Sequence, residues 1–500
     1  MEQLSYRTLD RLNYDGYLLR EAPERVLQFG AGNFLRGFVE DFIDRMNETA
    51  EFCGKVVIAL PISTGPADQI NAQEGLYTLL LRGREEGKPV SRRRVISCVS
   101  RCIKTYEDYP ALLACAKNPA LRFLVSNTTE AGIVYDGSCR FDDTPPASFP
   151  AKLTRFLYER FTLGLPGFLI LSCELIDHNG DELKRCVLKH VEQWNLPAAF
   201  ADWVERENQF CSTLVDRIVT GYPRAEAETL WKQLGYEDHL LDTSEVFGSW
   251  VIEGPPSLRE ELPFERAGLP ILVTDDCTLY KQRKVRILNG AHTSLVLGAY
   301  LAGQNIVRGC MEDEVIRGFL NRTVESEIIP TLDLPRRELI EFAAAVSERF
   351  QNPYIDHRLL DIALNSTAKW KARDMPSLLE YVQRTGELPP CLTFSFAAYL
   401  SFYHGGEERC ENGLLGRRGG ETYEIRDDPW ILDFYYDHRN DDSAALVRAV
   451  IGNRRMWDGA LVALPDFEEK VTAALKRIQT LGMYEAMREC LESGSSPNRT

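Results

Sequence analysis

Short apolar runs recur through the first half of the chain. They occupy residues 25–29, 55–60, 121–125, 168–171 and 269–273. Runs of this length with little polar alternation are typical of strands in a parallel sheet covered on both faces. Helix-like patterns lie between them, at residues 107–116 and 182–194. Alternating strands and helices predict an α/β fold with a parallel sheet.

After residue 276 helix-like periodicity dominates. The pattern predicts helices at residues 312–329, 337–350, 359–372, 375–385, 392–403 and 467–490. Residues 405–428 are rich in Gly, Arg and Glu and are expected to form a loop, and residues 1–22 a short polar arm. Because 500 residues exceed a single core, we expect two domains. They are a Rossmann-type dinucleotide-binding domain at residues 22–275 and a mostly α-helical domain at residues 276–490.

A glycine turn follows the first strand. Gly30 and Gly32 precede a helical face marked by Phe34 and Phe38, and strand, glycine turn and helix is the context of a dinucleotide fingerprint. The third glycine of G-x-G-x-x-G is replaced by Leu35. The residues expected at the cofactor are Val26, Leu27, Gln28, Phe29, Gly30, Ala31, Gly32, Asn33, Phe34, Leu35, Arg36, Gly37, Thr128 and Thr129.

Two features of this predicted cofactor site stay open in the sequence. Arg36 is either a phosphate ligand or an exposed helix arginine. Residues 61–64, after the second strand, offer hydroxyl groups but neither an acid for the ribose nor an arginine for a 2′-phosphate. The sequence therefore only favours NAD over NADP.

Polar residues follow other predicted strands. Residues 126–132 form a polar cluster after a buried strand, which is either a ligand site or ordinary turn chemistry. Asn179-Gly180 is a turn signal first and a site candidate second. Asp216-Arg217 lies in an apolar run, and we expect either a site role or a pair that neutralises itself.

Lys284, Asn289 and His292 lie within nine residues. In an α-helix, at about 100° per residue, His292 and Asn289 would lie roughly 80° and 140° around from Lys284, so that all three can face one cavity. A buried lysine can serve as an acid or base, and a carboxamide can stabilise negative charge on a carbonyl oxygen. This trio suits the interconversion of an alcohol and a ketone. The alternative is a solvated surface helix.

Composition narrows the choice of partners and compartment. The net charge of -16 argues against a nucleic-acid partner. The 13 cysteines are scattered without a C-x2-C pair, which favours reduced cytoplasmic thiols over disulfides or a zinc site. Neither a signal sequence nor an apolar run of about 18 residues is found, so no membrane span is expected.

Taken together, these motifs resemble the polyol-specific long-chain dehydrogenases, whose best-known member is mannitol 2-dehydrogenase. The resemblance covers residues 23–490. It rests on Gly30-Ala31-Gly32-Asn33-Phe34-Leu35-Arg36, on Val215-Asp216-Arg217-Ile218, and on Lys284, Asn289 and His292 in K-x4-N-x2-H. Residues 126–133, 173–177, 289–293 and 349–355 place it with members acting on keto-hexuronates.

The resemblance implies a fold, a reaction and residue roles. It implies a cleft between the two domains, NAD as cofactor, no metal, and reduction of a 5-keto-hexuronate. Lys284 matches the general acid/base, Asn289 a carboxamide that polarises the carbonyl, and His292, Asp216, Arg349 and Asn352 substrate contacts.

One departure from the family pattern bears on the substrate. Mannitol dehydrogenases place a second asparagine where Ser172-Cys173-Glu174-Leu175 stands here. Either Asn289 works alone, or Asn179 or a backbone N–H replaces the missing group. The alternatives are a reductase of another keto-hexuronate or of a neutral ketose, and a nucleotide-binding sensor without turnover.

Overall fold

The computed structural model describes residues 1–129, 131–406 and 408–493. The chain forms two compact units. The first unit is Met1–Gly83 with Val90–Cys277, and the second unit is Arg84–Pro89 with Thr278–Thr500. A short segment near residue 87 thus belongs to the second unit although the chain on both sides of it belongs to the first.

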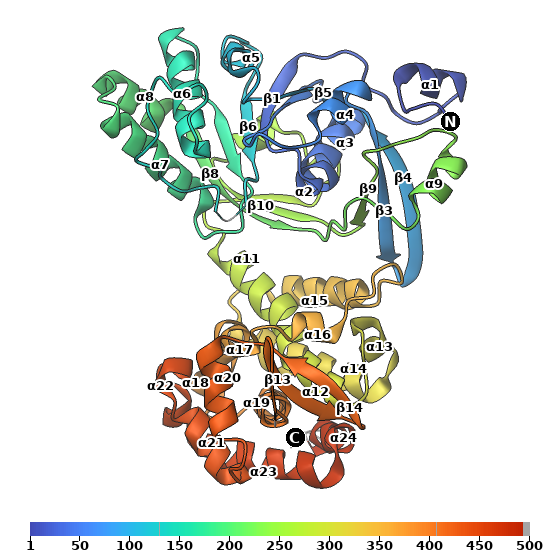
Figure 1. Cartoon of the computed structure of the whole chain (residues 1–500), viewed down its shortest axis with the longest axis vertical. Helices are drawn as coiled ribbons and strands as arrows, with labels where there is room; N and C mark the ends of the chain where they lie inside the picture. The colour runs from blue at the N-terminus through green and yellow to red at the C-terminus, as the bar shows by residue number, and fades with distance from the viewer. Residues whose placement is uncertain (130, 407, 494–500) are drawn as a thin grey trace. The chain divides into compact units, whose positions relative to one another are not determined.

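An eight-stranded sheet forms the centre of the first unit (Figure 1). Its order is β11-β10-β8-β7-β6-β1-β2-β5. The strands are β1 (Glu24–Phe29), β2 (Lys55–Ala59), β5 (Val99–Ile103), β6 (Phe123–Ser126), β7 (Leu169–Ser172), β8 (Gln209–Asp216), β10 (Ser249–Glu253) and β11 (Ile271–Thr274). From β5 to β8 all neighbours are parallel, whereas β10 is antiparallel to β8 and parallel to β11. In chain order these six parallel strands follow the 3-2-1-4-5-6 arrangement of a Rossmann fold.

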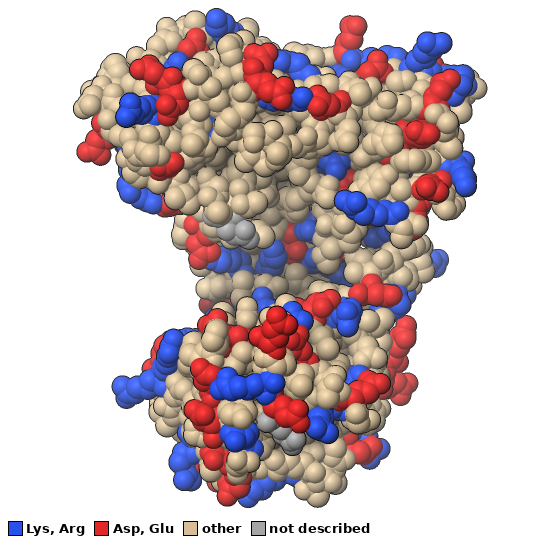
Figure 2. Space-filling model, viewed as in Figure 1, with Lys and Arg blue, Asp and Glu red and all other residues tan. Residues whose placement is uncertain are grey.

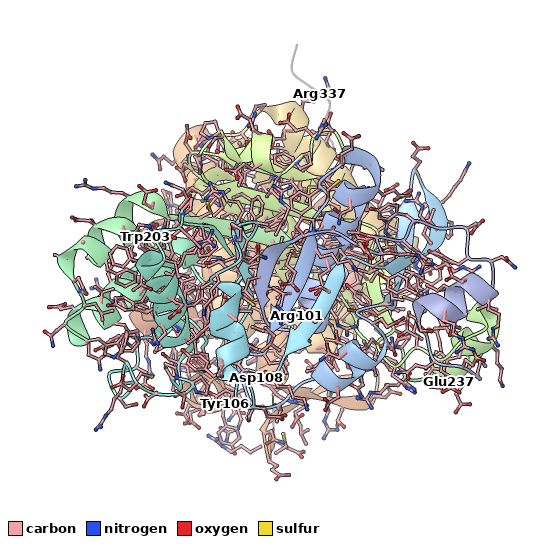
Figure 3. The ribbon with its side chains drawn as sticks, turned by 90° about the horizontal axis from the view of Figure 1, so that it is seen from above. Arg101, Tyr106, Asp108, Trp203, Glu237 and Arg337 are labelled. Atoms are coloured by element: carbon pink, nitrogen blue, oxygen red, sulfur yellow. The ribbon has the colours of Figure 1, made fainter. Side chains whose placement is uncertain are left out.

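Helices cover both faces of this sheet. On one face, α5 (Tyr109–Cys115), α6 (Phe149–Thr162), α7 (Asn179–Gln193) and α8 (Ala198–Glu207) pack against Leu27, Phe29, Leu124 and Ile170. On the other, a continuous helical segment packs against Val26, Phe123 and Leu169, and comprises α2 (Asn33–Leu35), the π-helical η1 (Arg36–Glu40) and α3 (Asp41–Ala50). Figure 3 shows Asp108, which caps α5 by accepting a hydrogen bond from the N–H of Ala111 at 3.0 Å, and Trp203 on α8. Successive strand residues thus enter opposite cores, as the apolar runs predicted.

The expected N-terminal arm is in fact folded. The helix α1 (Tyr6–Arg11) starts at Ser5, whose hydroxyl accepts a hydrogen bond from the N–H of Thr8. Leu4 and Leu9 are buried with Leu76, Val95 and Tyr236. An isolated β-bridge joins Gln3 to Glu237, and Figure 3 labels Glu237. The first unit also contains a second sheet, of order β4-β3-β9. Its strands are β3 (Tyr77–Glu85), β4 (Lys88–Ile96) and β9 (Asp242–Glu245); the remaining helices of this unit are α4 (Ala67–Ala72), α9 (Ala227–Leu234) and α10 (Leu258–Glu261).

The second unit is mostly helical. Its first helices are α11 (Thr278–Arg283), the π-helical η2 (Lys284–Gly290), α12 (Ala291–Leu301), α13 (Val307–Glu312), α14 (Glu314–Arg322), the π-helical η3 (Thr323–Ile328), the 3₁₀ turn η4 (Ile329–Thr331) and α15 (Arg336–Phe350). There follow α16 (Leu359–Ile362), α17 (Ser366–Arg373), α18 (Met375–Thr385), α19 (Pro390–His404), α20 (Pro429–Asp437), α21 (Ser443–Ile451), α22 (Arg454–Trp457), η5 (Leu461–Ala463), α23 (Phe467–Leu481) and α24 (Met483–Ser493). The long helix expected at residues 467–490 is broken at Gly482, whose φ of 82° ends α23.

The loop expected at residues 405–428 was a wrong prediction. In its described part, the segment forms an antiparallel sheet of β12 (Glu408–Cys410), β13 (Gly413–Arg418) and β14 (Glu421–Ile425). Gly419 and Gly420 join β13 to β14 with φ of 56° and 89°, the left-handed pair that a two-residue hairpin requires. Leu414 of β13 and Ile425 of β14 pair with each other and are both buried.

The face of the protein in Figure 2 carries charges of both signs. On the face shown in Figure 2, basic and acidic side chains are interspersed. Among the described residues, every helix is too short or too polar to cross a membrane.

Candidate functional site

The glycine turn after β1 leaves open space at Gly32. Val26, Leu27, Gln28 and Phe29 form the end of β1, and the turn follows directly. Gly30 has a φ of 114°, which favours glycine, whereas a Cβ at Gly32 would meet no atom within 4 Å. Gly32 and the neighbouring Asn33 are exposed. The turn therefore offers backbone groups and free space that fit a dinucleotide pyrophosphate.

The third glycine of G-x-G-x-x-G normally allows the helix to pack closely, and here Gly37 lies in such a close contact instead of residue 35. Leu35 is buried in the core, and Gly37 lies in the π-helical turn η1, where an added Cβ would come within 2.9 Å of Val219 Cγ1. A π-turn adds one residue to the helical turn, so the position of close helix packing moves along the chain. The later position of the third glycine thus coincides with a π-helical turn in the helix that follows the motif.

Arg36 is neither exposed nor directed to solvent. Its guanidinium donates to the carbonyl of Leu240 and to Oδ1 of Asn33, each at 2.6 Å, and lies over the ring of Tyr77. The alternative of an exposed helix arginine was wrong. A phosphate contact stays a prediction, because nothing in the structure tests it.

A buried polar network supports the same helix. Gln28 Nε2 donates to the carbonyl of Gly30 at 2.8 Å and to Glu40 Oε1 at 2.7 Å. The Tyr77 hydroxyl lies 2.7 Å from Glu40 Oε2 and 2.8 Å from the carbonyl of Arg36. Burial raises the pKa of the Glu40 carboxyl, and the hydrogen bonds from Tyr77 and Gln28 oppose that rise. This network ties the glycine turn to the π-helical turn behind it.

The polar cluster after β6 is held by one carboxylate. Glu174 Oε1 accepts hydrogen bonds from the N–H and the hydroxyl of Thr128, both at 3.0 Å, and Ser126 binds the other oxygen at 3.1 Å. Burial raises the pKa of Glu174. Thr129 is exposed with a φ of 68°, and Glu130 in the predicted stretch lies outside the described residues.

Asn179 cannot replace the missing second asparagine. Its Nδ2 donates to the carbonyls of Glu174 and Thr213 at 2.9 and 3.0 Å, and its Oδ1 accepts from the N–H of Thr213 at 2.8 Å. The side chain is 1% exposed. Its hydrogen bonds are used in joining the loop after β7 to β8, so this alternative was wrong.

Arg217, which follows Asp216 in the chain, has its ionic partner elsewhere. Arg217 donates to Asp41 Oδ2 and to the carbonyl of Gly37, both at 2.8 Å, so its ionic partner belongs to the helix after the glycine turn. The expected self-neutralising pair is therefore not what balances Arg217. Asp216 is buried at the end of β8.

In the second unit, the stretch that contains Lys284 is π-helical. The helical segment runs from Thr278 to Leu301, and its middle part, Lys284–Gly290, has π geometry. The α-helical angles expected between Lys284, Asn289 and His292 therefore do not apply across this segment, because a π-turn inserts a residue. Lys284 and Asn289 are both half-buried, and the Asn289 carboxamide has no hydrogen-bond partner among the described residues. Single π-turns inside α-helices occur frequently at functional sites.

His292 is a neutral imidazole in a cationic setting. Its ring stacks on Phe350 at a centroid distance of 4.2 Å and meets His357 edge-on at 5.5 Å. Its Nε2 is buried and has no hydrogen-bond partner in the described part of the chain. Burial first, and then the charges of His357, Arg349, Arg373 and Lys369, lower the pKa of His292 to about 3. Such an imidazole can bind a hydroxyl group but cannot supply positive charge at neutral pH.

Sequence reasoning found Arg349 but missed the other cations near His292. Arg373 donates to the hydroxyl of Thr293 at 3.2 Å, and Lys369, one turn earlier on α17, donates to the carbonyl of Ile362 at 2.8 Å. Burial lowers the pKa of both groups. Asn352 is buried, and its Oδ1 accepts from the N–H of Tyr354 at 3.0 Å, in the turn that follows α15. The sequence predicted a helix at residues 359–372, but it did not indicate that basic residues from this region would lie near His292.

Family models match most of the chain. Residues 24–266 match the mannitol dehydrogenase Rossmann domain, and residues 276–479 match the mannitol dehydrogenase C-terminal domain. An altronate oxidoreductase of Yersinia enterocolitica is 44% identical over 492 residues, which are 96% of this chain and 99% of that protein. An altronate oxidoreductase of Escherichia coli is 46% identical over 493 residues, with the same two coverages.

Two solved structures share the fold. A D-sorbitol dehydrogenase in substrate-free form aligns with a TM-score of 0.82 at 22% identity, covering 97% of this chain and 100% of that one. The mannitol 2-dehydrogenase of Pseudomonas fluorescens, in a ternary complex with NAD and D-mannitol, aligns with a TM-score of 0.68 at 21% identity. That alignment covers 98% of this chain and 99% of the other.

Proposed function

This chain belongs to the mannitol dehydrogenase family, and we propose that it interconverts D-tagaturonate and D-altronate with NADH and NAD. The observation behind this proposal is the end-to-end similarity, at 44–46% identity, to proteins named altronate oxidoreductase. The cations that surround His292 support an anionic substrate. In a chain of net charge -16, a carboxylate needs such local positive charge.

The first unit would hold the cofactor. The open space at Gly32 and the end of β1 fit the pyrophosphate, and Thr128 and Thr129 lie after the neighbouring strand β6. When bound, NADH supplies a hydride to the ketone carbon. The absence of an arginine from residues 61–64 supports NAD over NADP.

The π-helical segment of the second unit would supply the proton and the oxyanion contact. Lys284, as an ammonium ion, donates its proton to the ketone oxygen, and neutral Lys284 accepts it in the reverse reaction. Asn289 donates a hydrogen bond to the same oxygen while its negative charge grows. Its carboxamide has no partner among the described residues, so it is available for that role.

The remaining residues would hold the substrate. His292 binds a hydroxyl group, Arg349 the carboxylate, and Asp216 and Asn352 further hydroxyl groups. We place the reaction in the cytoplasm, where all 13 free cysteines would stay reduced.

The test is a comparison of substrates in an NADH-consumption assay. Initial rates are measured with D-tagaturonate, D-fructuronate and D-fructose. We expect the highest kcat/KM with D-tagaturonate and the lowest with D-fructose, which lacks the carboxylate. A preference for D-fructose would contradict the proposal, and no NADH consumption with any of them would favour the nucleotide sensor.

A further inference from the structure

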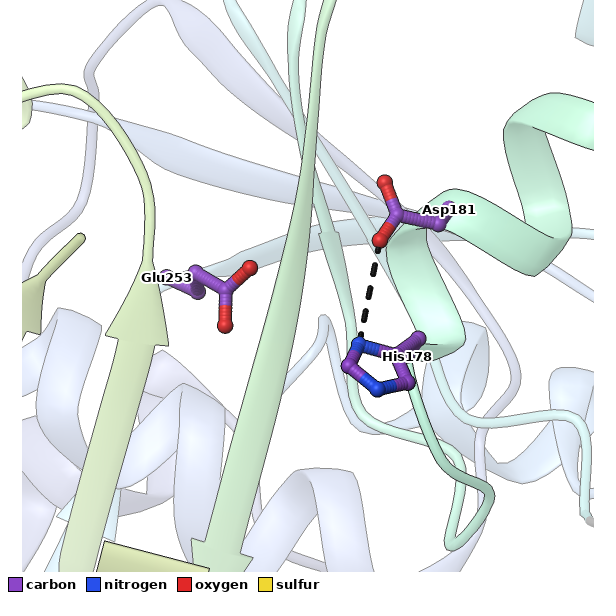
Figure 4. A group of neighbouring side chains, drawn as sticks. All are labelled: His178, Asp181 and Glu253. Atoms are coloured by element: carbon purple, nitrogen blue, oxygen red, sulfur yellow. Dashed lines mark ion pairs between the residues drawn. The ribbon is translucent and has the colours of Figure 1, made fainter. Parts of the chain in front are cut away.

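Three side chains of types that bind metal ions meet beside the end of β7. His178, Asp181 and Glu253 each offer one ligand atom, and these atoms all lie within 4.8 Å of one another (Figure 4). His178 Nδ1 is 3.9 Å from Asp181 Oδ2. This is the one group of three such residues in the part of the chain that the structure describes.

The fold brings these residues together from distant parts of the chain. His178 directly precedes α7, and Asp181 lies in its first turn. Glu253 ends β10 and pairs with Ser212 of β8, which pairs in turn with Ser172 at the end of β7. The sheet register therefore places Glu253 beside the loop that presents His178. An ion bound here would connect the start of α7 to β10.

Access and charge both favour a cation from solvent. The side chains of His178 and Asp181 are 64% and 68% exposed, so an ion could enter without unfolding. Asp181 and Glu253 bring two carboxylates together in a chain of net charge -16. A divalent ion would remove the repulsion between these two carboxylates. The partial positive charge at the N-terminus of α7 offsets that repulsion only weakly.

A backbone group holds the carboxylate of Glu253. The N–H of Cys277 donates to Glu253 Oε2 at 3.0 Å. Imidazole and carboxylate ligands together suit zinc, whereas magnesium and calcium prefer oxygen ligands alone.

We propose that His178, Asp181 and Glu253 form a zinc site. The site would replace the sequence-based expectation that the protein holds no metal. The proposed reaction does not use this site, and zinc binding can be measured without an activity assay.

The experiment titrates zinc chloride into the full-length protein after dialysis against a chelator, with calorimetry and thermal unfolding as readouts. His178→Asn removes the imidazole and keeps a residue that tolerates the φ of 50° found there. Glu253→Gln keeps an acceptor for the N–H of Cys277. We expect one zinc ion per wild-type chain and a rise in Tm. Each variant should lose at least about tenfold in zinc affinity, since even groups that only orient a ligand cost that much.

His438→Asn is the matched control. His438 and Asp441 repeat the spacing of His178 and Asp181, with Nδ1 and Oδ2 2.7 Å apart, but belong to no group of three among the described residues. This variant should bind zinc as the wild type does. The proposal would be overturned if the wild type bound no zinc, if His178→Asn and Glu253→Gln bound zinc as tightly as the wild type, or if the wild type bound magnesium more tightly than zinc. If either variant is unfolded, exposed Asp181→Asn takes its place with the same expected loss.

Discussion

Two π-helical segments, Arg36–Glu40 and Lys284–Gly290, differ in what surrounds their polar side chains. In the first, every residue is buried, and Arg36 and Glu40 are bound by protein groups. In the second, Lys284 and Asn289 are half-buried, and the amide of Asn289 has no partner among the described residues. The same backbone irregularity thus supports packing in one unit and carries partly exposed polar side chains in the other. Substitutions in the two regions should separate these roles.

The largest effect is expected at the glycine turn beside the first segment. Gly32→Val should abolish NADH binding, because the side chain would fill the space that fits the pyrophosphate, while Tm stays near the wild-type value. Fluorescence titration with NADH measures the first effect. Gly37→Ala is the contrasting variant, since its Cβ would press on Val219 and lower Tm. Unchanged NADH affinity in Gly32→Val would remove the cofactor assignment.

Lys284→Met should lower turnover by roughly 10²- to 10⁴-fold, the range for losing a positioned acid or base. NADH affinity should change little, because the amine is assigned to the substrate. Steady-state rates with D-tagaturonate measure the loss. Lys371→Met, which removes a lysine paired with Asp458 in the same unit, should keep its turnover. Near-normal turnover of the Lys284 variant would mean that the second π-helical segment is not catalytic.

Arg349→Ala should lower kcat/KM for D-tagaturonate by about 10- to 150-fold, the cost of a charged hydrogen bond of about 1.5–3 kcal/mol. Activity on D-fructose should fall much less. Lys281→Ala, which removes another cation in the last turn of α11, three residues before Lys284, is measured beside it. Equal losses on both substrates would show that Arg349 holds a hydroxyl group or the fold, and would leave the carboxylate to another cation.

Tyr77→Phe tests the packing role of the first segment. It removes the hydroxyl that meets Glu40 and Arg36, and should cost about 1–3 kcal/mol in the free energy of unfolding. kcat should not change. Tyr109→Phe is the matched control, because the buried Tyr109 hydroxyl has no hydrogen-bond partner in the described chain. Equal urea midpoints for the two variants would contradict a structural role for the network.

The smallest effect concerns acid stability near the second segment. The pKa of His292 is lowered to about 3 in the fold, against about 6.5 in the unfolded chain. The unfolded state therefore takes up a proton first, and stability is lost as pH falls from about 6.5 towards 3. His292→Gln should reduce the fall in urea midpoint between pH 7.5 and pH 5, whereas a His239→Gln variant at an exposed site should not. An unchanged acid slope in His292→Gln would contradict the buried neutral imidazole.

The sequence predicted most of the architecture. The α/β class, the family resemblance and the helix at Met375–Thr385 are confirmed. The roles of Lys284, Asn289 and His292 stay predictions. Apolar runs and helical periodicity were sufficient for these elements, because each buries a continuous face.

What the sequence missed has local physical causes. The small sheet at residues 408–425 was missed because its polar composition hid a Gly419-Gly420 hairpin signal. The π-turns could not be predicted from hydrophobic periodicity, because one inserted residue changes the pattern of a short helix too little to be recognised. The engagement of Asn179 depends on a strand, β8, that lies 34 residues further along the chain.

The short segment Arg84–Pro89 forms a contact with a part of the chain that is synthesised much later. The N–H of Gly87 donates to Glu348 Oε1 at 2.7 Å, and 261 residues separate the two. At about 5–20 residues per second, a ribosome needs very roughly 13–50 seconds to make the intervening chain. The tip between β3 and β4 therefore waits in the nascent polypeptide for a partner not yet translated. A fragment begun at Thr278 would lack this tip from the outset.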